Sequence, residues 1–70
     1  MAMADKIRFL LIKRKTTARE LAGSLKISPQ NLSNRLHDDD FSEKELNEIA
    51  NILNCTFEGS FTLNDTGEKI

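Results

Sequence analysis

The sequence predicts a mainly α-helical domain over residues 1–70 that ends in a β-strand or short hairpin. Apolar residues recur at helical spacing in four segments, and residues typical of helix starts precede three of them. From Cys55 onward the pattern changes to alternation, which is typical of a strand. Since a chain of this length supports one small core, we expect a single domain in which four helices share that core.

The first two helices are predicted over residues 4–14 and 17–25. One side of the first carries a stripe of five residues: Met3, Ile7, Leu10, Leu11 and Arg14. The positive charge of residues 13–15 suits a helix C-terminus. In the second, Thr17 is the expected N-cap, and Glu20 three residues later completes a reciprocal capping box.

The next two helices are predicted over residues 29–37 and 42–54. Ser28 can cap the third helix, and Pro29 suits a first helical position, where its missing N–H costs nothing. Ser42 and Glu45 form a capping box for the fourth helix. Its apolar stripe comprises Leu46, Ile49, Ala50 and Leu53.

The C-terminal segment, residues 56–70, is predicted to be a strand or short hairpin. Alternation from Thr56 to Leu63 places three large apolar residues on one side: Phe57, Phe61 and Leu63. Residues 64–67 have turn chemistry, so residues 68–70 could return. A short hairpin cannot bury this apolar side alone. It can pack on the helices of its own chain or cross a two-fold interface, and we favour the dimer contact.

Charge divides the chain into a basic and an acidic half. Residues 1–36 hold eight Lys and Arg against two acidic residues, a balance of +6, whereas residues 37–70 hold two Lys against nine acidic residues, a balance of −7. This asymmetry indicates a basic working face, as a nucleic-acid partner would require.

Cysteine and histidine counts exclude several site classes. With only Cys55 and His37 of these types, no disulfide within one chain and no Cys/His zinc site can form. The acidic run 38–40 lacks the alternating ligands of a calcium loop. No cofactor, metal, small-molecule ligand or enzyme activity is therefore expected. A lone thiol, without an apolar stretch of membrane-spanning length, predicts a cytoplasmic protein away from membranes.

The most informative stretch runs from Thr17 to His37. Its two helices are joined by so tight a turn that they must cross steeply, as in a helix-turn-helix unit. The outward side of the second carries four polar residues: Gln30, Asn31, Ser33 and Asn34. An amide presents a donor beside an acceptor and can pair with adenine in the major groove. We therefore expect these four residues to read DNA bases.

The run Thr17–Ala22, followed by Lys26–Leu36 and the segment "FSEKEL", resembles the lambda repressor and Cro-like (XRE-type) helix-turn-helix family. The resemblance covers about residues 7–53 and implies a compact bundle of four to five helices that binds operator DNA, usually as a two-fold dimer. It places the four polar residues above at base edges. It also places six residues near phosphates: Lys13, Arg14, Lys15, Thr17, Lys26 and Arg35.

Three departures from that family have physical consequences. Lys26 replaces the usual turn glycine, where φ is positive, and should cost some stability. Ala18 replaces a glutamine that contacts phosphate and braces the next helix. The acidic residues 38–40 follow the third helix, where many members approach the DNA backbone, so this loop should angle away or affinity should be modest.

These observations predict a sequence-specific regulator that binds double-stranded DNA, acting as a repressor and a homodimer. The alternative is an antitoxin-like or inhibitor module that binds a protein through the acidic half and the C-terminal phenylalanines.

Overall fold

The computed structural model describes residues 2–70 as four helices followed by a hairpin. The helices are α1 (Met3–Lys13), α2 (Ala18–Leu25), α3 (Pro29–Asp38) and α4 (Glu43–Ile52). Strands β1 (Cys55–Phe57) and β2 (Phe61–Leu63) pair antiparallel. The predicted mainly α fold with a C-terminal hairpin is thus confirmed, with four helices in these residues. None of them is long and apolar enough to cross a membrane.

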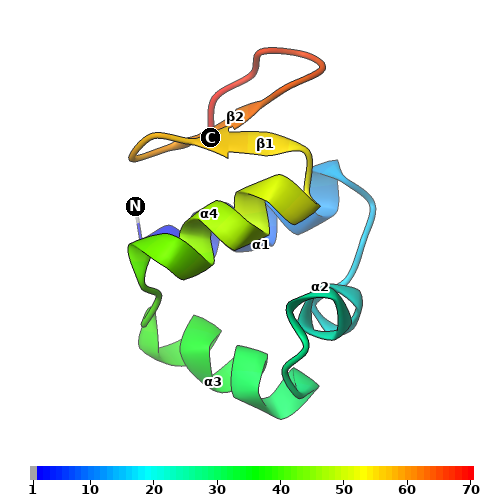
Figure 1. Cartoon of the computed structure of the whole chain (residues 1–70), viewed down its shortest axis with the longest axis vertical. Helices are drawn as coiled ribbons and strands as arrows, with labels where there is room; N and C mark the ends of the chain where they lie inside the picture. Colours follow the sequence, from blue (N-terminus) through cyan, green and yellow to red (C-terminus); the bar gives the residue numbers. More distant parts are fainter. Residues whose placement is uncertain (1) are drawn as a thin grey trace.

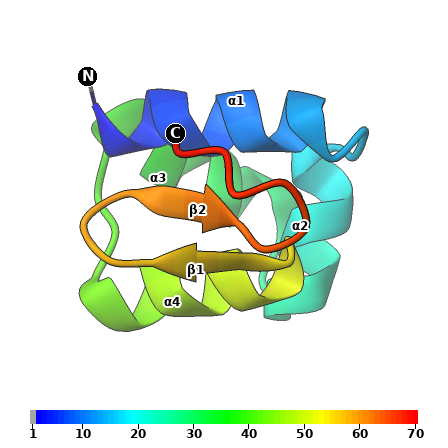
Figure 2. The same cartoon turned by 90° about the horizontal axis from the view of Figure 1, so that it is seen from above.

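The elements are stacked along the long axis of the molecule. Figure 1 shows the hairpin at one end, α3 at the other, and α1 and α4 between them. Seen down that axis in Figure 2, α1 and α4 form opposite edges, with β1 over α4 and the C-terminal segment toward α1. The outward side of α3 therefore faces away from the hairpin.

The hydrophobic core draws on all four helices and the hairpin. The largest fully buried side chains are Ile7 and Leu10 of α1, Leu21 of α2, Leu32 of α3, Ile49 of α4 and Phe61 of β2. Because β2 delivers Phe61 onto the helices, the hairpin is part of this core and not an appendage.

Side-chain caps set the starts of three helices. Ser28 and Ser42 accept the N–H groups of Asn31 and Glu45, and at Ser42 the capping box is complete. Thr17 accepts the N–H of Glu20 at 3.2 Å, but the Glu20 carboxylate accepts the Thr16 hydroxyl at 3.0 Å. The reciprocal half of the capping box predicted at Thr17 is therefore wrong: Thr16 takes that carboxylate.

Each helix is followed by a residue other than glycine in the left-handed region: Lys15, Lys26, Asp39 and Asn54, with φ between 53° and 60°. After α1, α2 and α3, the next N–H returns to a carbonyl five residues earlier, as from Ile27 to Ala22 at 3.0 Å. This closes the helix at the expense of backbone strain.

The hairpin is more finely divided than the alternating pattern predicts. The run from Thr56 to Leu63 is not one strand, because Gly59 (φ 78°) turns the chain and pairs Phe57 with Phe61. After a second turn, the C-terminal segment returns along β2. The Ile70 N–H donates to the Phe61 carbonyl at 2.8 Å, so the predicted return is present.

Candidate nucleic-acid interface

The turn between α2 and α3 has the geometry that a helix-turn-helix requires. Lys26 adopts φ 60° and ψ 38°, and its N–H donates to Gly23 at 3.2 Å. Ser28 then caps α3, so three residues separate the helices. Ala22 is completely buried, and its small side chain lets the helices approach closely. The predicted positive φ at Lys26 is confirmed.

The exposed side of α3 carries all four residues predicted to read bases: Gln30, Asn31, Ser33 and Asn34. Leu32 and Leu36 anchor the opposite side in the core. Since the four exposed side chains contribute nothing to that core, packing does not explain their polar character.

Two hydrogen bonds order the amides along α3. Gln30 Nε2 donates to Asn34 Oδ1 at 3.0 Å, and Arg35 Nε donates to Asn31 Oδ1 at 2.8 Å. The Gln30 oxygen and the amide nitrogens of Asn31 and Asn34 take no part in these two hydrogen bonds. Each pair restricts side-chain rotamers before DNA arrives, which lowers the entropy cost of binding.

Three of the predicted phosphate ligands are exposed around α2. Thr17 lies at its N-terminus, Lys15 precedes it and Lys26 follows it. Within residues 2–70, neither lysine forms an ion pair. Arg19, in the first turn of α2, is also exposed and unpaired in this part of the chain. Arg19 is one of the eight cations of the basic half, and the sequence pattern left it without a predicted contact, although its place beside the Thr17 cap was a usable signal.

Two other predicted phosphate ligands are paired with acidic residues. Lys13 lies 3.2 Å from the Glu68 carboxylate, and Arg35 pairs with Glu45 of α4. The side chains are a third or so exposed, so either cation can exchange its carboxylate for a phosphate at modest cost.

Arg14, also predicted to contact phosphate, is bound within its own chain. Its guanidinium donates to the carbonyls of Leu53 (2.8 Å) and Asn54 (2.9 Å), and to both carboxylate oxygens of Asp65 (2.9 Å). The Asp65 carboxylate raises the pKa of Arg14, and the Arg14 hydrogen bonds lower the pKa of Asp65. Arg14 thus ties α1 to the end of α4 and to the hairpin.

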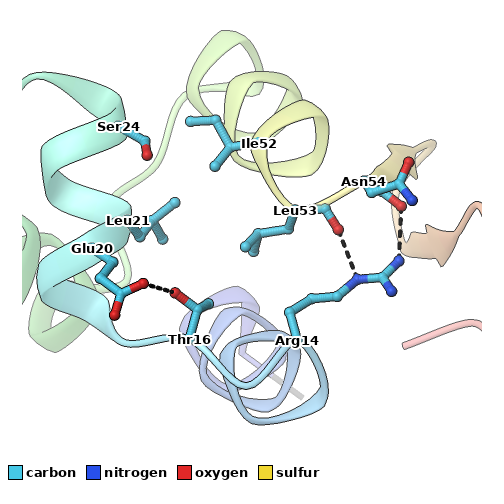
Figure 3. Close-up of a pocket in the computed structure, with 8 residues that line it drawn as sticks. All are labelled: Arg14, Thr16, Glu20, Leu21, Ser24, Ile52, Leu53 and Asn54. Carbon is cyan, nitrogen blue, oxygen red and sulfur yellow. Dashed lines mark hydrogen bonds between the residues drawn. The ribbon is translucent and has the colours of Figure 1, made fainter.

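An open pocket of about 330 Å³ adjoins this arginine between α2 and the ends of α1 and α4 (Figure 3). Leu21, Leu53 and Ile52 form its apolar wall, and the hydrogen bond between Thr16 and Glu20 borders it. The pocket lies on the flank of the bundle, away from the exposed amides of α3.

The acidic loop after α3 is tied back to the start of α1. Asp39 Oδ1 accepts the Ala4 N–H at 2.7 Å, which satisfies a free donor at a helix N-terminus, where negative charge is favoured. His37 Nδ1 lies 3.1 Å from Asp38. Among the residues that the structure describes, no three His, Cys, Asp or Glu side chains form a potential metal site.

Two of the three hairpin side chains predicted to form a dimer contact are buried within the chain. Phe61 and Leu63 are only 0% and 3% exposed and belong to the same buried cluster as residues of α1 and α4. Phe57 stays half-buried, with its ring centroid 5.0 Å from that of Phe61. The chain itself buries two of the three side chains assigned to the interface.

This arrangement of two tightly joined helices, the second exposing a polar side beside unpaired cations, defines a helix-turn-helix DNA-binding domain. Residues 6–64 match the Cro/C1-type HTH DNA-binding domain, and the chain belongs to that family. No curated protein and no solved structure gives a significant match to the chain.

Proposed function

We propose that this chain is a transcriptional repressor that reads the major groove of duplex DNA with the exposed side of α3. The observation that carries the proposal is the group of three amides and one serine on a helix side that the core does not need. Gln30, Asn31, Ser33 and Asn34 contact base edges, and an operator covered in this way excludes the transcription machinery. The protein acts in the cytoplasm as a homodimer.

Phosphate contacts supply most of the affinity and its salt dependence. The DNA backbone is contacted on either side of α2 by Lys15, Thr17 and Lys26. Arg19 adds a phosphate contact between them. Lys13 and Arg35 also contact phosphates, once they have exchanged the carboxylates of Glu68 and Glu45 for them. Arg14 takes no part, since withdrawing it would leave Asp65 and two backbone carbonyls without their donor.

Selection of bound duplexes from a random pool, at near-physiological salt, tests the proposal. A palindromic motif with half-sites about 10 base pairs apart is expected for a two-fold helix-turn-helix protein. Recovery of no motif would contradict base reading, and pull-downs for a protein partner would then replace DNA assays.

Alanine variants then assign the readout to α3. Gln30→Ala and Asn34→Ala should each cost about 1–3 kcal/mol on the selected site and little on scrambled DNA. Asn51→Ala is the matched control, because it removes an exposed amide from α4, away from α3. Equal losses on both DNAs, or an equal loss in the control, would refute the assignment.

A further inference from the structure

Arg35 links the exposed polar side of α3 to the start of α4. Its Nε donates to Asn31 Oδ1 at 2.8 Å, and its Nη1 pairs with Oε2 of Glu45. The other carboxylate oxygen of Glu45 accepts the Ser42 N–H at 3.1 Å and completes the capping box of α4. The Arg35 guanidinium is therefore held between two helices, with 33% of its side chain exposed.

This contact determines which end of the Asn31 amide faces Arg35. A guanidinium has five N–H donors and no acceptor, so only the oxygen of the amide can bind it. The Nδ2 group of Asn31 is therefore turned away from Arg35, and neither of its N–H groups takes part in this hydrogen bond.

The other pair of side chains on α3 imposes no such direction. Gln30 Nε2 donates to Asn34 Oδ1 at 3.0 Å, but each amide holds both a donor and an acceptor. If both amides turn over, the hydrogen bond forms again with Asn34 as the donor. Asn31 is thus the amide on this side of α3 whose direction a cation determines.

We propose that Arg35 orients Asn31 as a donor to DNA, so that Asn31 selects guanine over adenine. Adenine presents its N7 acceptor beside the N6 donor, and a free amide meets both with one N–H and its oxygen. Guanine presents two acceptors, N7 and O6, which suit a group that only donates. The inference rests on the proposed function, because it requires α3 to lie in the major groove.

The charge of the guanidinium adds to this preference. Asn31 Oδ1 keeps a second lone pair that is able to accept another donor. The N6 amino group of adenine would have to approach that oxygen beside the Arg35 cation, and its partly positive hydrogens would be repelled. Guanine O6 carries partial negative charge and is attracted to the same cation.

Arg35 can orient Asn31 on DNA as well as in the free protein. Asn31 is the third residue of α3, and residues at the start of a recognition helix contact base edges. Glu45 pairs with Nη1 of Arg35, whereas Asn31 accepts from Nε. A phosphate can therefore replace Glu45 at Nη1 without breaking the hydrogen bond to Asn31. Arg35 thus serves as a phosphate contact and as a positioning residue.

Selection of bound duplexes by the wild type and by Asn31→Ala locates the base pair that Asn31 reads, which is the position whose preference the variant loses. We expect guanine there in the wild type. Arg35→Met keeps the length of the side chain but removes its donors, so the ratio of guanine to adenine affinity at this position should fall about tenfold. Lys15→Met is the matched control, because it removes another proposed phosphate contact and should weaken binding without changing this ratio.

Two further measurements separate positioning from the other roles of Arg35. In the Asn31→Ala background, Arg35→Met should leave the base preference unchanged, since no amide remains to be oriented. In the protein without DNA, the Arg35 Nε–H should exchange with water faster in Asn31→Ala than in the wild type. This exchange measurement uses no Arg35 variant, so it does not depend on whether Arg35→Met folds.

Adenine at the position that depends on Asn31, or a guanine preference that survives Arg35→Met, would overturn the inference. So would a motif with no position that depends on Asn31, or Nε–H exchange that is the same in Asn31→Ala and the wild type. Failure of the wild type to select any motif would refute the proposed function instead.

Discussion

Replacing Lys26 by glycine should make the protein more stable. Lys26 adopts φ 60°, where a side chain costs about 1–2 kcal/mol, because its Cβ meets the following carbonyl. Glycine avoids this strain but loses about 0.5–1 kcal/mol more conformational entropy on folding. The difference leaves a gain of about 0.5–1 kcal/mol, which is a rise in melting temperature of about 2–8 °C for a domain of this size.

Lys26→Ala is the control for this substitution, because it removes the same charge and keeps the strain. Thermal unfolding should therefore rank Lys26→Gly above the wild type and Lys26→Ala at or below it. If Lys26 contacts a phosphate, both variants should bind DNA more weakly, with the slope of log affinity against log salt reduced by about one.

The relative stability of the two variants shows whether the backbone at Lys26 is strained. A Lys26→Gly protein no more stable than Lys26→Ala would refute the assignment of strain to this turn. A salt slope unchanged in both variants would leave the strain argument intact but remove Lys26 from the phosphate contacts.

Three further substitutions test contacts seen in the structure. Asp39→Ala should lower the free energy of unfolding by about 1 kcal/mol or more, because the Ala4 N–H loses its acceptor, whereas Asp39→Asn should retain most of it in chemical denaturation. Arg14 lowers the pKa of Asp65 below its ordinary 3.8. The contribution of the Arg14–Asp65 pair to stability is therefore complete above that value and is lost as the pH falls through the lowered pKa. Asp65→Asn should thus destabilise the neutral protein and flatten the acid limb of a stability–pH curve, and an unchanged limb would contradict the pairing. Gly23→Ala should stabilise α2 by about 0.5–1 kcal/mol in thermal unfolding, because a Cβ there meets open space, and a loss of stability would mean that Gly23 has another role.

Much of the helical part could be predicted because its signals are local. Ser28 and Ser42 lie within three residues of the N–H groups that they accept. The strain at Lys26 follows from the short turn between α2 and α3, which requires a positive φ at that position. These contacts depend on neighbouring residues alone, so a sequence pattern specifies them before any tertiary packing is known.

The roles of Asp39 and Arg14 could not be predicted in this way. Asp39 accepts the N–H of a residue 35 positions earlier, and Arg14 binds a carboxylate 51 residues later. At Arg14, helical spacing predicted a place beside the core, and that spacing holds for its partly buried stem. Only the tertiary fold brings the acceptors of Leu53, Asn54 and Asp65 to the Arg14 guanidinium. A guanidinium held by these acceptors is less available to DNA.

The burial of Phe61 and Leu63 has a similar origin. Alternation shows which residues share a side of a strand, but it does not show which surface covers that side. Here the hairpin lies over the helices, and Phe61 and Leu63 join the buried cluster that residues of α1 and α4 also form, so the chain covers its own apolar residues (Figure 2).

The charge asymmetry of the sequence consequently has two physical causes. Part of it is internal, because Lys13, Arg14 and Arg35 of the basic half pair with Glu68, Asp65 and Glu45 of the acidic half. The remaining cations around α2 form no such pairs in the described chain, so they are the part of the basic half that stays available to a polyanion.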